Sequence, residues 1–190
     1  MTTAIEPELV HLAANGDRAA VAALLTGVRP GLVRYCRARL GRVGGAYTTA
    51  DDVAQEACLA VLKALPGYRD QGRPFSAFVF AIAANKVADA QRAAVRSAAV
   101  TDADLEQEDT TPGPEQQAVA TDLARRLSAL LHRLPDLQRE IITLRVAVGL
   151  TAEEVGSILG MSAPAVRVAQ SRALARLRTL AGDGLDEVAA

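Results

Sequence analysis

The sequence predicts an all-α protein of two small helical domains joined by a flexible linker. Half of the 190 residues are hydrophobic, and the abundance of Ala, Leu, Arg, Glu and Gln favours helices. Two stretches with apolar residues at helical spacing flank an acidic stretch that has no such period. No apolar run reaches the roughly 18 residues that a membrane span needs.

The charges divide the chain more sharply than the net charge of −1 suggests. Residues 1–96 and 119–180 each carry four more basic than acidic residues, whereas residues 97–118 carry six acids and no base. A segment with that charge, interrupted by Pro-Gly-Pro, is typical of a disordered linker. Two basic domains favour a nucleic-acid partner, which a pI of about 6 alone would not indicate. The predicted parts are a domain at 1–96, a linker at 97–117, a second domain at 118–182 and a tail at 183–190.

Four helices are expected in the N-terminal domain. Turn residues and capping patterns place their ends: the expected helices run from Pro7 to Leu25, with a candidate break at Gly16-Asp17, from Pro30 to Leu40, from a capping box at Thr49-Ala-Asp-Asp to Leu65, and from Phe75 to Arg96.

The third of these helices carries a mostly polar strip that includes one Leu. Its members are Asp52, Gln55, Glu56, Leu59 and Lys63, with Val53, Ala57, Val61 and Ala64 opposite. An exposed strip of this kind suits a partner helix. The alternative is an ordinary solvated face with one incidental Leu.

All three Phe residues of the chain lie at the start of the fourth helix. Phe80 shares a face with small apolar residues, so we expect it in the core. Phe75 and Phe78 lie beside a polar, basic face, where aromatic rings could stack on unpaired bases. The alternative is that all three rings fill a core that is otherwise made of small side chains.

The C-terminal domain contains a helix-turn-helix pattern. We expect helices at 115–132, from Pro135 to Val148, from a capping box at Thr151-Ala-Glu-Glu to Leu159, and at 163–180 after a Ser162 cap. A short helix, a Gly turn and a longer helix are typical of this motif. On the last helix Val166, Ala169, Ala173 and Leu177 face inward, against the short helix. The outward face and its edges carry Pro164, Arg167, Val168, Ser171, Arg172 and Arg176, a basic surface that suits DNA phosphates and base edges. The alternative is a solvated basic helical hairpin.

The order of these motifs resembles one protein family. ADDVAQEACLAVLKAL followed by YRDQGRPFSAFVFAIAANKVADAQRA resembles region 2 of the extracytoplasmic-function (ECF) sigma factors of bacterial RNA polymerase. LPDLQREIITLRVAVGLTAEEVGSILGMSAPAVRVAQSRALARLR resembles their region 4. RYCRAR, DDVAQE and AVRVAQSRAL resemble an actinobacterial subgroup that includes the mycobacterial sigma D type.

The resemblance implies a division of roles. The polymerase core would be bound through its β′ coiled-coil and its β flap, promoter DNA as a −35 duplex and a melted −10 non-template strand, and an anti-sigma factor is a further partner to expect. The linker would cross the polymerase active-site cleft and RNA exit path, and the loop 67–74 would capture a flipped base. The implied core-binding residues are Asp52, Gln55, Glu56 and Leu59; the implied −10 residues are Tyr68, Arg69, Arg73, Phe75, Asn85, Lys86, Arg92 and Arg96; the implied −35 residues are Ser162, Arg167, Val168, Ser171, Arg172 and Arg176.

The sequence departs from the family pattern at several of these positions. Phe78 stands where many members have Trp, and Phe80 where many have Tyr. Ala169 replaces a common Arg or Lys, and Pro164-Ala165 replaces Gly-Thr. The −35 contacts are therefore expected to be fewer or shifted.

Two other functions compete with this interpretation. A free-standing helix-turn-helix regulator would bind duplex DNA alone, but it needs neither the polar strip nor the aromatic loop. An enzyme built on Asp51, Asp52 and Glu56 would need a partner His or a metal-loop spacing, which the sequence lacks. Cys36 and Cys58 fit no metal spacing and favour a reducing, cytoplasmic setting. We therefore expect a specificity subunit that is not an enzyme and that needs no cofactor or metal.

Overall fold

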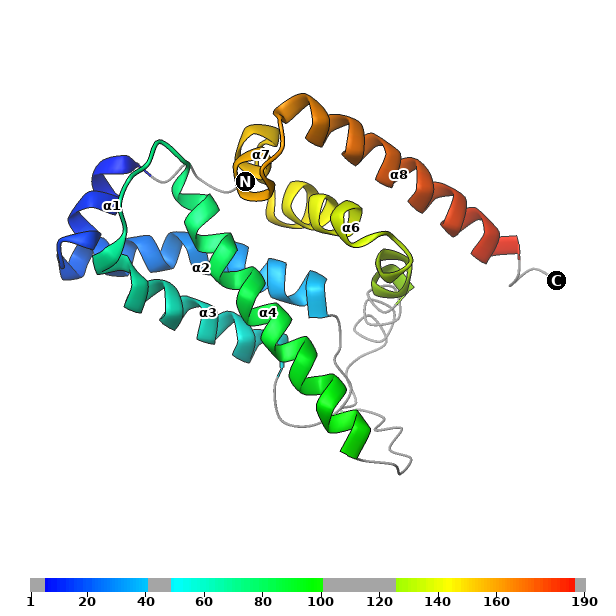
Figure 1. Ribbon diagram of the computed structural model, residues 1–190, viewed down its shortest axis with the longest axis horizontal. Coiled ribbons are helices and arrows are strands. Elements are labelled where there is room, and N and C mark those ends of the chain that lie inside the picture. The colour runs from blue at the N-terminus through cyan, green and yellow to red at the C-terminus, as the bar shows by residue number, and fades with distance from the viewer. Residues whose placement is uncertain (1–5, 41–48, 101–125, 187–190) are drawn as a thin grey trace, which may run out of the picture.

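The computed structural model describes residues 6–40, 49–100 and 126–186, and every regular element among them is helical (Figure 1). This confirms the predicted all-α class. Residues 101–117 of the expected linker, and residues 187–190 of the expected tail, lie outside the described residues. The elements are α1 (Pro7–Ala14), α2 (Arg18–Leu40), α3 (Ala50–Ala64), the 3-10 turn η1 (Leu65–Gly67), α4 (Phe75–Val100), helical residues 126–132, α6 (Asp136–Ile142), the π-helical segment η2 (Thr143–Val148), α7 (Ala152–Leu159) and α8 (Ala163–Asp186).

The helix α2 is continuous through Pro30, where the sequence predicted the start of a separate helix. A proline inside a helix costs about 3 kcal/mol. Burial explains why the helix continues: Leu24, Val28 and Leu32 recur at every fourth residue across the proline, and none is more than 5% exposed. The candidate break at Gly16 is confirmed, since Gly16 has a φ of 90° and separates α1 from α2.

Both predicted capping boxes are present. At the start of α3, the Thr49 hydroxyl accepts from the Asp52 amide at 3.2 Å, and Asp52 Oδ2 accepts from the Thr49 amide at 2.8 Å. At the start of α7, the Thr151 hydroxyl and the Glu154 carboxylate make the same reciprocal pair at 3.1 and 2.8 Å. Each box satisfies amides that the first helical turn leaves without a partner, so it fixes where the helix begins.

The helix-turn-helix depends on two glycines. Gly160 ends α7 with a φ of 67°, a conformation that L side chains rarely adopt. Gly156, inside α7, lies so close to the turn that a Cβ there would be 2.5 Å from the Met161 carbonyl oxygen. The turn can therefore fold back tightly against α7, and the start of α8 follows directly.

The inner face of α8 is divided between two cores. Val166 is fully buried and belongs with α7 to the main core, and Ala169 packs at its edge. Ala173 and Leu177, which the sequence also assigned to the α7 contact, lie instead against Leu131, Leu134 and Ile142. This assignment was therefore wrong for the second half of the stripe, because α8 is longer than α7 and continues over α6. It also extends to Asp186, past the predicted end at residue 180.

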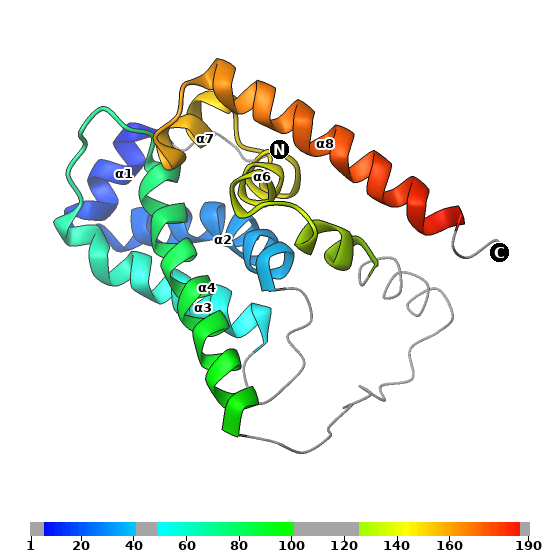
Figure 2. The ribbon, with the colours of Figure 1, turned by 45° about the vertical axis from the view of Figure 1, so that its right-hand side comes forward.

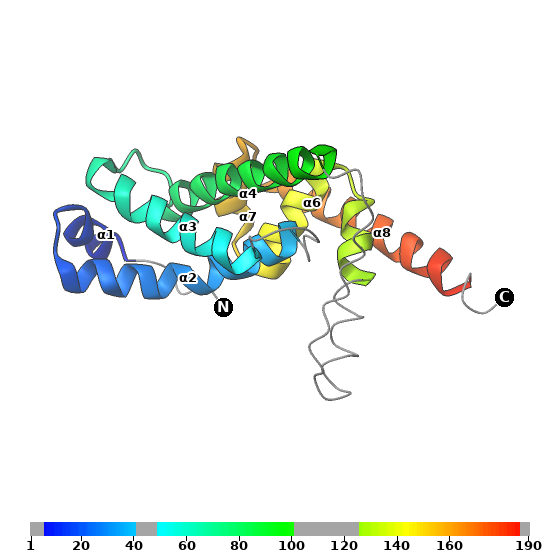
Figure 3. The same ribbon diagram turned by 90° about the horizontal axis from the view of Figure 1, so that it is seen from below.

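The two halves of the chain pack directly against each other. The segment η2 lies along α2 and α7 lies along α4, while α8 lies on the outer side of α6 (Figures 1 and 2). Seen from below, α3 and α4 lie side by side and α8 projects away from them (Figure 3). One continuous core cluster includes residues of both halves. In the part of the chain that the structure describes, no helix has the length and apolarity that crossing a bilayer requires.

Candidate nucleic-acid and partner interfaces

The polar strip on α3 is exposed, as its period predicts. Asp52, Gln55 and Glu56 are all on the surface, and Leu59 is 50% exposed. Beneath them Val53, Ala57 and Val61 are buried. The strip is thus a rigid helical surface that is backed by the core and presents one apolar side chain among polar ones.

The carboxylates of this helix already have partners within the fold. Asp51 accepts two hydrogen bonds from Arg37, at 2.7 and 2.6 Å, and these bonds lower the pKa of Asp51. The Asp52 carboxylate caps its own helix, and the hydrogen bond from the Thr49 backbone amide lowers its pKa. Both groups therefore remain ionised at neutral pH in structural roles, and neither behaves as an acid–base catalyst. Within the described ranges, no group of three or more His, Cys, Asp and Glu is placed to hold a metal ion.

The aromatic rings at the start of α4 form a cluster with Tyr68. The Tyr68 ring lies edge-on to Phe75 and Phe78, with centroid distances of 5.2 and 5.0 Å. Phe80 is in the core, as predicted, and its ring meets Tyr35 at 5.5 Å. Phe75, however, is only 7% exposed and is more buried than Phe78, the reverse of the expected order. The reason is that Phe75 lies where α7 packs on the first turn of α4.

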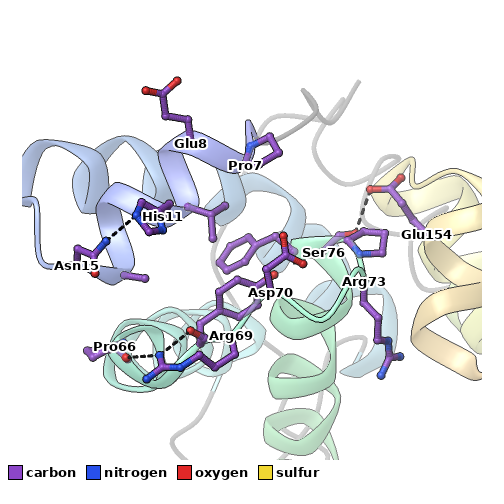
Figure 4. Close-up of a pocket in the computed structure, with 15 residues that line it drawn as sticks. Pro7, Glu8, His11, Asn15, Pro66, Arg69, Asp70, Arg73, Ser76 and Glu154 are labelled. Atoms are coloured by element: carbon purple, nitrogen blue, oxygen red, sulfur yellow. Dashed lines mark hydrogen bonds between the residues drawn. The ribbon is translucent and has the colours of Figure 1, made fainter.

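A cavity of about 900 Å³ opens beside this cluster (Figure 4). Its walls come from α1, the loop 67–74, the first turn of α4, and Glu154 of α7. Arg69 lies at the rim, with its guanidinium donating to the Pro66 and Tyr68 carbonyl oxygens. On the α1 wall, Asn15 and His11 are hydrogen-bonded to each other at 3.0 Å. Sequence reasoning treated His11 as isolated, since nothing local links it to a loop that is more than 50 residues away.

The outward face of α4 continues from the cavity as a polar surface. Asn85, Arg92 and Arg96 are exposed, and Lys86 is half-buried. Lys86 Nζ lies 3.4 Å from Glu56 Oε2, so this face adjoins the α3 strip. Arg92 is paired with Asp89 on its own helix. Two of the residue sets that the sequence predicted as separate sites therefore touch.

The outward face of α8 is completely available. The six residues predicted there, Ser162, Arg167, Val168, Ser171, Arg172 and Arg176, are all exposed. Arg167 Nη2 lies 2.5 Å from Glu153 Oε1 of α7, and both side chains are more than half exposed. The pKa of Glu153 is lowered by a hydrogen bond from its own backbone and by Arg167, so Glu153 holds Arg167 while ionised. A phosphate or base edge would have to compete with this exposed, weak pair.

Two family models match the chain. The model described as Sigma-70 region 2 matches residues 24–97, and the model described as Sigma-70, region 4 matches residues 130–179. The first contains the α3 strip and the face of α4, and the second contains the helix-turn-helix.

Relatives with named functions are similar over nearly the whole chain. The ECF RNA polymerase sigma factor ShbA of Streptomyces griseus is 54% identical over 184 residues, covering 94% of this chain and 96% of the relative. The ECF RNA polymerase sigma factor SigD of Mycobacterium tuberculosis is 53% identical over 171 residues, covering 90% and 81% respectively. Among solved structures, CnrH in complex with the cytosolic domain of CnrY matches with a TM-score of 0.68 and 28% identity, over 93% of this chain and 96% of that one.

Proposed function

The chain belongs to the extracytoplasmic-function family of RNA polymerase sigma factors, and from that premise we propose which residues carry each part of its work. As a sigma factor it directs the polymerase core to promoters through region 2 and region 4. Family members are transcription initiation factors. The chemistry of RNA synthesis therefore lies with the polymerase, and this chain needs no catalytic centre of its own.

Binding of the polymerase core is assigned to the α3 strip. The support is that Asp52, Gln55, Glu56 and Leu59 are all exposed on one rigid helix and have no large role in the core beneath them. A polar rim around one half-exposed Leu fits a helical partner such as the β′ coiled-coil. Region 4 would meet the β flap.

Capture of the melted −10 strand is assigned to the aromatic cavity and the polar face of α4. The cavity offers the Tyr68 ring and the Arg69 guanidinium to an unpaired base, and Phe75 joins them once it is uncovered. Asn85, Lys86, Arg92 and Arg96 continue along α4, where cations would follow the strand phosphates. Arg73 leads into the same helix and belongs to this set.

Recognition of the −35 duplex is assigned to α8. One observation carries this assignment: the basic outward face is exposed along its length, while Val166 and Ala173 directly beneath it are fully buried. A helix fixed in this way can enter a major groove without rearranging its own domain. Ser162 and Val168 lie where the first turns would approach base edges, and Arg172 and Arg176 would meet phosphates.

A protein partner that restrains the chain is also part of this proposal. CnrH, which is similar over both domains, is held in a complex with the cytosolic domain of a second protein. An anti-sigma factor acting on this chain would need to cover the α3 strip or hold the two domains together. Because its target is the polymerase on the chromosome, we place the protein in the cytoplasm.

A run-off transcription assay tests the assignments. Purified core polymerase would be incubated with the protein, or with its Gln55→Ala, Arg92→Ala or Arg167→Ala variant, on a genomic promoter library from the source organism. New discrete start sites with the wild-type protein, reduced by each variant, would support the proposal. No new starts, together with tight duplex binding by the protein alone, would instead support a free-standing regulator.

A further inference from the structure

The two proposed DNA sites differ in how the rest of the chain treats them. The α8 face is open to solvent, whereas the first turn of α4 lies under α7. Phe75 is 7% exposed, and the guanidinium of Arg73 donates to the Ser157 carbonyl oxygen of α7. The C-terminal domain thus occupies part of the surface that the −10 strand would use.

A polar latch holds the two domains together on the other side of the contact. The Glu140 carboxylate of α6 uses both of its oxygens there. Oε1 accepts from the Tyr35 hydroxyl at 2.7 Å, and Oε2 lies 3.1 Å from Arg39 Nε. The side chains of Arg39 and Glu140 are each only 15% exposed, so solvent screens this pair little. Burial, with Glu140 alongside, raises the pKa of Tyr35, so its hydroxyl remains a donor.

Two further contacts cross the interface. Arg34 Nε donates to the Ala147 carbonyl oxygen at 2.9 Å, at the end of η2. Ser76 Oγ donates to Glu154 Oε1 at 3.0 Å, at the start of α4 (Figure 4). Glu154 caps α7 with its other oxygen, Oε2, so the contact with Ser76 is additional to the cap and can be removed without it.

The latch is strong enough to order the domains but incomplete. Among the described residues, Arg39 Nη1 is buried and has no hydrogen-bond partner, and its Nε lacks hydrogen-bond geometry toward Glu140 despite the short distance. A buried donor left in this way costs free energy. Gly31 shows how close the packing is, since a Cβ there would lie 3.4 Å from Phe80 and 3.6 Å from Val148 of the other domain. Close packing with an imperfect polar centre suits an interface that opens.

We propose that the free chain is closed by its own C-terminal domain, which caps the −10 strand site while leaving the α8 face and the α3 strip available. The polymerase core would then bind the open form better and shift the population toward it. In the closed form the chain can dock on the core or sample duplex DNA, but it cannot hold a melted strand. This inference rests on the proposed position of the −10 site.

The test compares wild type with a Glu140→Ala/Ser76→Ala double variant. Asp136→Asn/Thr26→Ala is the matched control, because it removes one carboxylate from α6 and one hydroxyl from α2 that bond only within their own helices. Small-angle scattering of the full chain measures the radius of gyration. Fluorescence anisotropy measures binding to a labelled random 12-nucleotide single strand and to a labelled random duplex.

We expect a compact wild type and control and an expanded double variant. Loss of three interdomain contacts should raise the open fraction, and with it the affinity for the single strand, by about tenfold, while duplex affinity stays unchanged. An extended wild type would overturn the closed state. Expansion without a gain in strand binding would overturn the capping role.

Folding and the proposed function are checked separately. If circular dichroism shows that the double variant is unfolded, Tyr35→Phe replaces it, since this change removes one hydroxyl and leaves the ring in place; the same two outcomes then decide. Run-off transcription by the reconstituted holoenzyme should be unchanged in the latch variant, because the core opens the chain in any case. Failure of Arg92→Ala to impair run-off would count against the proposed −10 site and not against closure.

Discussion

The outward face of α8 and the first turn of α4 are both expected to meet DNA, yet their states are opposite. Val168 on α8 is 50% exposed, while Phe75 on α4 is 7% exposed. The difference does not come from their own helices, since both lie on helices backed by buried side chains. It comes from the other domain, which covers one site and not the other. A site for duplex DNA can be permanently formed, whereas a site for a melted strand is useful only after the polymerase has bound.

The most damaging test removes the duplex-binding side of this comparison. Gly156→Ala would place a Cβ 2.5 Å from the Met161 carbonyl oxygen, a backbone atom that cannot move aside cheaply. We expect the free energy of unfolding of the C-terminal domain to fall by about 3 kcal/mol, with loss of −35 duplex binding. Thermal unfolding and duplex titration measure both effects.

Gly182→Ala is the control for that change, because it is the same substitution on a helix with nothing within 4 Å of the new Cβ. It should be neutral or slightly stabilising, since Ala is the better helix former. Equal behaviour of the two variants would mean that the turn is not packed as tightly against α7 as the distance indicates.

A smaller effect is expected when one side chain is removed from the exposed face. Arg167→Ala should weaken −35 recognition by about 1–3 kcal/mol if Arg167 reads a base edge. Arg178→Ala, on the same helix but near the edge of that face, is the control. Duplex binding measured over several −35 sequences and salt concentrations distinguishes the roles. A loss that is uniform across sequences, with a smaller salt slope, would assign Arg167 to a phosphate.

The α3 strip should respond without any change in either DNA site. Gln55→Ala with Glu56→Ala should weaken binding to core polymerase by about tenfold or more, since one interface hot spot alone contributes this much. The fold should be unaffected, because both side chains are exposed. A pull-down with Asp136→Ala as the charge control measures this. Unchanged affinity for the core would remove α3 from the interface.

The smallest expected effect sharpens the contrast between cap and latch. Thr151→Ala removes the hydroxyl that accepts from the Glu154 amide at 3.1 Å. It should cost the C-terminal domain about 1 kcal/mol of stability and leave the Ser76–Glu154 contact in place. Chemical denaturation gives the first value and scattering the second. Expansion of the chain in this variant would show that the cap and the latch are coupled.

Features set by neighbouring residues could be predicted from the sequence. The capping boxes at Thr49 and Thr151 depend on four consecutive residues, and the exposed faces of α3 and α8 follow from the helical period alone. The turn at Gly160 is equally local. These features carry most of the proposed core-binding and −35 sites, which is why their residues were found on the surface where they were expected.

Features set by distant residues could not be predicted. Pro30 remains inside α2 because a buried stripe continues across it, and local propensity argued the other way. Tyr35 and Glu140 are 105 positions apart, and no periodicity connects them. The burial of Phe75 has the same origin, since it depends on where α7 lies. A sequence read in segments identifies surfaces but does not say which of them cover each other.

The π-helical segment η2 places a constraint on chain length. Glu140 engages the N-terminal domain before the segment, and the Ala147 carbonyl engages it after. Deleting one residue between 143 and 148 would let the backbone relax to an α-helix and would turn everything that follows by about 100° about the helix axis. Each domain would retain its own sequence signals, but the two anchors would no longer face α2 in the same phase. Natural length variation in this chain should therefore be concentrated elsewhere and be rare within these six residues.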